Sequence, residues 1–139
     1  MAFNVAAFLS IAERLQFDQT VSSRDEATIR TTAGRMYYAA YLATRESLRI
    51  ISGDPRYDLN HSAMVAFLER QKDAGVSQIG GQLRELMDQR KCADYHPDRP
   101  IDFRTVGIKL RDAKLVLAGQ ALIRARITKT MLPPSERLP

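Results

Sequence analysis

Apolar residues recur every three or four positions along this chain of 139 residues, and no stretch alternates apolar with polar residues. The longest such segment runs without a proline to about Ile51, after a Ser-x-x-Glu capping box formed by Ser23 and Glu26. This spacing is typical of amphipathic helices, whereas half-buried strands require alternation. The pattern therefore predicts an all-α protein, an antiparallel up-and-down bundle of about five helices.

Turn and capping residues set the expected boundaries of the other helices. We predict helices over residues 3–15, from Asp58 or Asn60 to about 72, from Ser77 to about Asp94 or Tyr95, and from Asp102 to about 129. The Asp-Ala-Gly triplet at 73–75 is expected to end the third helix. Gly34 lies inside the long helix and costs about 1 kcal/mol relative to alanine, so it predicts a close approach by another helix.

The expected last helix carries apolar residues on two sides. Its main stripe is Phe103, Val106, Leu110, Ala113, Leu117 and Ala121, and its second stripe is Ile108, Leu115 and Leu122. A helix of this kind is either central to its own bundle or shared with another chain, and the sequence predicts a homodimer. We expect residues 1–130 to form one domain and residues 131–139 a flexible tail.

Composition and charge narrow the class of protein. A single cysteine excludes an internal disulfide, and no apolar run is long enough to span a membrane, so we expect a cytoplasmic protein with no membrane association. The net charge is +5, and the eleven basic and six acidic residues between 84 and 129 account for all of it. A basic half favours an anionic partner, most commonly nucleic acid, although an ordinary solvated helix surface is the alternative.

One short stretch gathers the polar groups with the strongest chemical case. Arg90 falls on the last turns of the fourth helix, and His96 follows just beyond its expected end because Pro97 disfavours helical backbone at His96. Cleavage of RNA without a metal requires an acid, a base and a cation at the phosphorane. Histidine transfers protons near neutral pH and arginine matches phosphate oxygens. The alternative is that Arg90 caps the helix and His96 is a loop residue.

The other candidate sites have weaker support in the sequence. One cysteine and two histidines give no zinc-ligand spacing, so no metal and no cofactor is predicted. A nucleophilic pair of Cys92 and His96 lacks a third residue to orient the base. The tyrosines at 37, 38 and 41 could stack on bases, but at helical spacing they are more often core residues. His61, at a helix start, either caps and packs or has a functional role.

Three segments together resemble the HEPN family, the higher eukaryotes and prokaryotes nucleotide-binding domain, over residues 8 to about 125. They are the Arg-small-Tyr-Tyr-Ala helix at 29–41, the segment 61–67, and the segment 86–95 that ends in Ala-Asp-Tyr. The resemblance implies an antiparallel helical bundle that often dimerises. Many members are metal-independent ribonucleases, including toxins that pair with nucleotidyltransferase-type antitoxins.

The resemblance also implies roles for individual residues. Arg90 and His96 match the family's arginine followed a few residues later by histidine, which implies a phosphate clamp and an acid/base. The residues expected to bind substrate are Lys91, Asp94, Tyr95, Arg99 and Arg35. Ala-Asp-Tyr at 93–95 is also found in a branch that needs no histidine. Position 98 is aspartate where the toxin branch has tyrosine, so modification of Tyr95 by an antitoxin does not carry over cleanly. A non-catalytic module that binds nucleotide, RNA or a partner protein is the alternative function.

Overall fold

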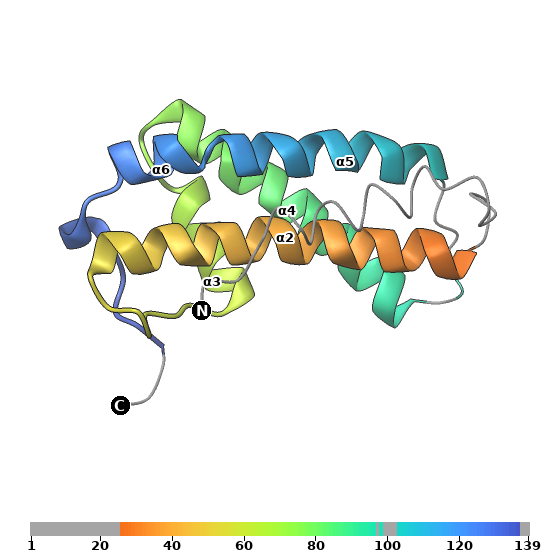
Figure 1. The fold of residues 1–139 in the computed structure, drawn as a ribbon, viewed down its shortest axis with the longest axis horizontal. Helices are drawn as coiled ribbons and strands as arrows, with labels where there is room; N and C mark the ends of the chain where they lie inside the picture. The colour runs from red at the N-terminus through yellow and green to blue at the C-terminus, as the bar shows by residue number, and fades with distance from the viewer. Residues whose placement is uncertain (1–25, 97, 99–102, 137–139) are drawn as a thin grey trace.

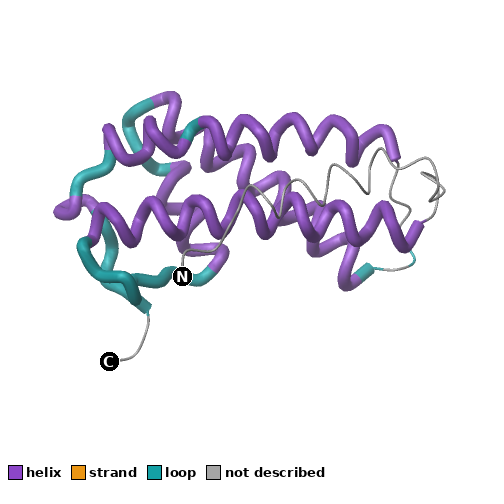
Figure 2. Tube along the Cα trace, viewed as in Figure 1, coloured by secondary structure: helices purple, strands orange, loops and turns teal. Residues whose placement is uncertain are grey.

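The structure is a computed structural model that describes residues 26–96, 98 and 103–136, without the side chains of residues 26, 28 and 103–107. Its helices are α2 (Glu26–Ser52), α3 (His61–Glu69), α4 (Ala74–Tyr95), α5 (Phe103–Ala118) and α6 (Gln120–Arg126), followed by a short 3₁₀ turn, η1 (Lys129–Met131). Figure 2 shows helices joined by loops, with no strand in the described part of the chain. The predicted all-α bundle is confirmed, while the helix expected at 3–15 lies outside the described residues.

Three long helices run side by side along the bundle (Figure 1). Helix α4 is antiparallel to both α2 and α5, and α2 packs against each of them. The short α3 packs against α4, and α6 continues in the direction of α5 and packs on α2. The up-and-down arrangement leaves the end of α4 beside the beginning of α2.

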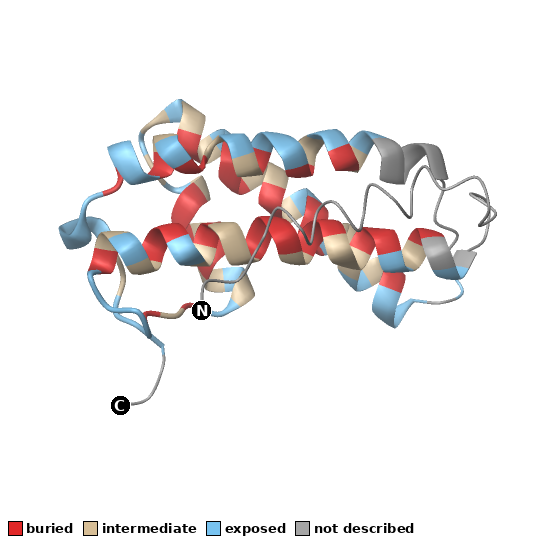
Figure 3. Ribbon diagram, in the orientation of Figure 1, coloured by how far each residue is buried: buried red, intermediate tan, exposed pale blue. Residues whose placement is uncertain are grey.

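The core lies where the apolar faces of these helices meet (Figure 3). Its fully buried side chains come from every described α-helix, including Val116 of α5, and from the loop before α3; the largest are Tyr37, Met36, Leu48, Leu59, Met64, Leu68, Leu83, Leu86 and Ile123. Burying one leucine-sized side chain contributes about 1.5–3 kcal/mol. Because α2 and α4 pack against each other in this core, the residues on their outward-facing sides are held in fixed positions relative to one another.

Helices α2 and α3 largely follow the sequence. Helix α2 ends one residue after the expected Ile51, and Gly53 adopts the left-handed conformation with φ +74° that glycine tolerates. Asn60 is the N-cap of α3, as predicted, because its side chain accepts a hydrogen bond of 2.8 Å from the backbone N–H of Ala63. Helix α3 ends at Glu69, a little before the expected residue 72.

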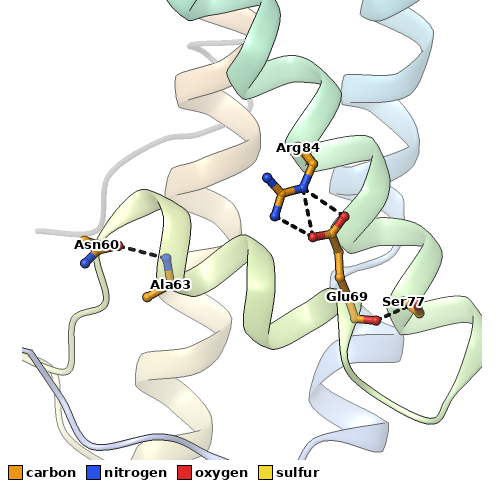
Figure 4. A network of polar contacts seen from close by, with 5 residues as sticks. All are labelled: Asn60, Ala63, Glu69, Ser77 and Arg84. Atoms are coloured by element: carbon orange, nitrogen blue, oxygen red, sulfur yellow. Dashed lines mark hydrogen bonds and ion pairs between the residues drawn. The ribbon is translucent and has the colours of Figure 1, made fainter.

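The prediction for the start of α4 was wrong. Asp73 is its N-cap and accepts a hydrogen bond of 3.1 Å from the backbone N–H of Val76, so the triplet at 73–75 begins a helix. Ser77, the expected cap, donates instead to the carbonyl of Glu69 at 2.9 Å, and the Glu69 carboxylate pairs with Arg84 (Figure 4). An aspartate after a short turn serves either as a stop or as a cap, and the tertiary contact of α3 with α4 decided between them.

The last predicted helix is broken at Gly119 into α5 and α6. A Cβ at Gly119 would lie 2.5 Å from Cδ1 of Ile79, so α4 approaches the backbone closely at the break. The buried stripe also differs from the expected one beyond Ala113: it continues through Val116, Gln120, Ile123 and Ile127, while Leu117 is half-buried and Ala121 is exposed. Gln120 escaped the apolar pattern because it is polar, and it hydrogen-bonds Thr44 and Ser47 of α2.

Two further expectations need correction. Gly34 makes no close approach, since a Cβ there would meet no described atom within 4 Å. Residues 131–136, expected to be a flexible tail, instead pack along the loop before α3. The hydroxyl of Tyr57 donates to the Pro133 carbonyl at 2.6 Å, and the backbone N–H of Glu136 donates to the Asp58 carbonyl at 2.9 Å. Residues 137–139 lie outside the described chain.

Candidate functional site

Arg90 lies on the last turns of α4, as predicted, where its mostly buried side chain is surrounded by aromatic rings and one carboxylate. Its Nη2 donates a hydrogen bond of 2.8 Å to the hydroxyl of Tyr38 on α2, and its Nε lies 2.9 Å from Oδ2 of Asp94. The second contact is an ion pair whose direction departs from that of a hydrogen bond. The guanidinium carbon lies 5.1 Å from the centre of the Tyr38 ring and 5.5 Å from that of Tyr95. Cation–π contacts of this kind hold the guanidinium in one place.

Behind Arg90, α2 and the first residue of α3 form a second polar cluster. Nδ1 of His61 is hydrogen-bonded to the hydroxyl of Tyr37, and the imidazole stacks on the Tyr41 ring with 4.1 Å between centroids and 10° between planes. The Tyr37 ring lies between this imidazole and Arg90, whose guanidinium carbon is 5.9 Å from the ring centre. Three tyrosines of α2, at positions 37, 38 and 41, therefore connect His61 at the N-terminus of α3 to Arg90 near the end of α4.

Burial determines the protonation states in this cluster. It raises the pKa of the Tyr37 hydroxyl far above its usual value, against the smaller opposing effect of the Arg90 charge. Burial also lowers the pKa of the His61 imidazole, with the Arg90 charge as the next cause and Asp58 opposing. At neutral pH the pair is therefore a neutral imidazole and a protonated phenol, and the cluster adds no charge next to Arg90.

The end of α4 is held by an arginine that the sequence interpretation did not single out. Nη1 of Arg30 donates to the carbonyl oxygens of Ala93 at 2.8 Å, Cys92 at 3.1 Å and His96 at 3.4 Å. A cation at a helix C-terminus satisfies the last carbonyls and stabilises the helix dipole. The capping role considered for Arg90 therefore belongs to Arg30, and Arg90 is directed to tyrosines and a carboxylate.

An open cleft of about 440 Å³ lies between α2 and the end of α4. It is lined by Arg30, Thr31, Gly34, Arg35, Tyr38 and Asp94. The volume lies in the range of small-molecule sites, which span roughly 300–1,000 Å³. Because Gly34 has no side chain, the helix backbone is open at this point of the cleft. The cleft walls carry two arginines, a tyrosine and the Asp94 carboxylate, and guanidinium groups match the geometry of phosphate oxygens.

The cleft brings together some of the predicted site residues. Arg35 and Asp94 line it. Arg90 is not among the lining residues, but it contacts two of them, Tyr38 and Asp94. Tyr95 lies against Arg90 and is 62 % exposed. The exposed Lys91 does not line it, and Arg99 lies outside the described residues.

His96 is the C-cap of α4, with φ −128° and ψ 70°. Its backbone N–H donates to the Cys92 carbonyl at 3.2 Å, so the chain leaves the helix where Pro97 predicted. The side chain is exposed, and among the described contacts no hydrogen bond or ion pair joins it to Arg90. The two groups therefore lie at the same end of α4, with no hydrogen bond or ion pair between them among the described contacts of a single chain.

The sequence interpretation weighed His61 without connecting it to Arg90, and it missed Arg30 and Tyr38 as neighbours of the fourth helix. Arg30 and Tyr38 lie more than fifty residues away from their α4 partners. The available signal was the spacing of Arg30 and Tyr38, which places both on neighbouring faces of one helix.

Part of the basic excess between 84 and 129 is neutralised within the fold. Two carboxylates from outside that stretch, Glu69 and Asp73, pair with Arg84 and Arg126. Charge alone is therefore a poor guide to the binding surface, and clefts with basic walls are the better one.

The described residues offer neither a metal site nor a membrane-spanning helix. No group of three or more histidine, cysteine, aspartate or glutamate side chains there is arranged to hold a metal ion. None of the helices in that part of the chain combines the length and apolar character that crossing a membrane requires.

No family model, curated protein or solved structure matches this chain. The resemblance to the HEPN family therefore remains a prediction, carried by the residues named above.

Proposed function

We propose that this protein is a HEPN-family ribonuclease that cleaves RNA without a metal ion and acts in the cytoplasm as a toxin or defence effector. The observation that carries the proposal is the cleft between α2 and the end of α4, where Arg30, Arg35 and the Tyr38 hydroxyl line one cavity. Arg90 lies directly behind it, hydrogen-bonded to Tyr38, and His96 ends the same helix.

The chemistry follows from these groups. The imidazole of His96 takes the proton of a ribose 2′-hydroxyl, and the 2′ oxygen attacks the adjacent phosphorus. The P–O5′ bond breaks, leaving a 2′,3′-cyclic phosphate, and the 5′ oxygen takes a proton from an acid. The Arg90 guanidinium stabilises the charge that develops on the phosphorane oxygens. In a two-fold dimer, the partner subunit's His96 would supply the acid.

The proposed dimer uses the outer face of α5. Ile108 and Leu115 are 58 % and 48 % exposed, whereas Leu122, the third member of this stripe, packs against the core. Two exposed aliphatic side chains about two turns apart form an apolar strip that a second copy would cover. A nucleotidyltransferase-type antitoxin is the further partner that the proposed function implies.

A non-catalytic module that binds nucleotide, RNA or a partner protein is the second candidate. It is favoured by the state of Arg90, whose charge is already matched by Asp94 and whose Nη2 is used by Tyr38. An arginine with these two partners is equally suited to supporting the wall of a binding cleft and to stabilising a transition state.

Cleavage of a fluorescent RNA in excess EDTA separates the two candidates. Arg90→Ala and His96→Ala should each lower the rate by about 10²–10⁴-fold if both groups take part in the chemistry. Arg56→Ala, an exposed arginine on the loop after α2, is the matched control and should cleave like the parent. Arg90→Lys keeps the positive charge but loses the planar, two-pronged guanidinium. It is the milder variant, which shows whether a lower rate comes from the lost guanidinium and not from loss of folding.

A further inference from the structure

A second open cleft, of about 660 Å³, lies at the opposite end of α4 from the first. Its walls carry three basic side chains, Arg70, Lys72 and Arg126, and one carboxylate, Asp73. Ile127 and Met131 also line it, and of these two Met131 is exposed and adds apolar surface. Figure 1 shows the turn between α3 and α4 at one end of the bundle and the C-terminal end of α4 at the other.

The fold holds this cleft in a defined shape. Arg70 is the C-cap of α3, and its backbone N–H donates to the Ala66 carbonyl at 3.1 Å. Asp73 uses Oδ1 to cap α4, while its Oδ2 lies 3.4 Å from Nε of Arg126 at the end of α6. Ile127, the C-cap of α6, is buried. Three helix ends therefore meet here, and each is fixed by its own hydrogen bonds.

The charge of the cleft remains positive after these contacts are counted. The pair of Arg126 and Asp73 is open to solvent, so it is a weak interaction. Arg70 and Lys72 are exposed, and neither side chain forms an ion pair with any residue that the structure describes. A guanidinium and an ammonium, both free to meet a ligand, suit phosphate oxygens, and the apolar surface beside them suits a sugar or the face of a base.

We propose that this cleft is a second contact for the RNA strand, binding its phosphates at a distance from the site of cleavage. The inference rests on the proposed function, because it takes RNA as the ligand of the first cleft. From Asp73 to Asp94, α4 rises about 32 Å at 1.5 Å per residue. One stacked strand advances about 3.4 Å per phosphate, so roughly nine or ten nucleotides are needed to reach from one cleft to the other.

The test measures how RNA affinity depends on salt. The probe is a 2′-O-methyl oligouridylate of about 20 nucleotides, which cannot be cleaved through its 2′ oxygen, bound to the full chain across a range of NaCl concentrations. The variant is Arg70→Gln with Lys72→Gln. The control, Arg56→Gln with Arg111→Gln, removes the same charge from exposed positions outside both clefts.

Each lost phosphate contact on a single strand lowers the salt slope of log K by about 0.7, so the cleft variant should lose about 1.4 and the control much less. Binding of a tetranucleotide should not distinguish the cleft variant from the parent, since it spans one cleft only. Equal slopes for the cleft variant and the control would overturn the proposal. A competition experiment could also overturn it. The contradicting result is that poly-glutamate, an acidic peptide, competes for the parent as well as the RNA does but does not compete for the cleft variant.

Failure of the proposed function has a different signature. If the parent binds the long RNA with the expected slope but cleaves no RNA, the ribonuclease assignment fails and the second cleft stands. If the parent cleaves RNA and the slopes are equal, the second cleft fails alone. A parent that binds no RNA at low salt removes both.

Discussion

The packing of α3 on α4 makes a sharp prediction at two adjacent glycines. A Cβ at Gly80 would lie 2.7 Å from the backbone nitrogen of Glu69 and 2.9 Å from Cβ of Leu68, both in the last turn of α3. A Cβ at Gly81 would meet no described atom within 4 Å. The two positions share a helix and a sequence context, so their alanine variants isolate the contact between the helices.

The magnitude follows from two opposing terms. Alanine gains about 1 kcal/mol over glycine in a helix interior. Overpacking costs about 1–3 kcal/mol, and at Gly80 the cost falls at the upper end because the nearest atom belongs to the backbone. Gly80→Ala should therefore lower the free energy of unfolding by about 1–2 kcal/mol, whereas Gly81→Ala should raise it by about 0.5–1 kcal/mol.

Urea unfolding followed by circular dichroism measures both variants against the parent. For a chain of this size, 1 kcal/mol corresponds to about 4 °C in Tm, so the two variants should differ by about 6–12 °C in a thermal scan. Two variants that shift together, in either direction, would refute the close approach of α3 to α4. The Glu69–Arg84 pair beside Gly80 would then also need another account.

Two other predictions concern pH and assembly. The pKa of His61 is lowered on folding from its ordinary value of 6.5, so the unfolded chain binds the proton first and stability should fall as pH drops below about 6.5. His61→Gln should flatten that fall in urea titrations between about pH 7.5 and 5.5, and an unchanged pH dependence would contradict the burial of the imidazole. The exposed strip of Ile108 and Leu115 should hold a homodimer, so changing both to glutamate should give monomers in sedimentation velocity. A parent that sediments as a monomer at micromolar concentration would count against it.

Periodicity predicted the long elements because their signal repeats many times. Helix α2 was placed to within a residue at its C-terminus, and α4 ended where Pro97 required. The boundary between α3 and α4 was misplaced because an aspartate followed by Ala-Gly fits both the end of one helix and the cap of the next. The structure has the second arrangement, in which Gly80 of α4 packs closely against Glu69 of α3.

Buried polar groups were the second source of error. Gln120 lies in the core because it donates to Thr44 at 3.1 Å and accepts from Ser47 at 2.8 Å, and no apolar pattern can register that. The expected stripe followed the apolar residues Leu117 and Ala121 and so placed Ala121 in the core, where the structure has Gln120 and Ile123.

Local sequence placed Arg90 correctly near the end of its helix, but its environment depends on residues far away in the chain. Tyr38 and Arg30 come from α2, and neither contact could be derived from spacing within 80–100. The joining of His61 to the same cluster through Tyr37 depends on how α3 packs, which is again tertiary information.

The most direct measurement of the proposed function is the rate at which the purified protein cleaves RNA in excess EDTA, for the parent, Arg90→Ala, His96→Ala and the control Arg56→Ala. We expect the parent and the control to cleave at the same rate and to leave 2′,3′-cyclic phosphate ends. The other two variants should be slower by about 10²–10⁴-fold and should unfold at the same temperature as the parent. A His96→Ala variant as fast as the parent, or a folded parent that cleaves none of the RNAs offered, would contradict the ribonuclease assignment.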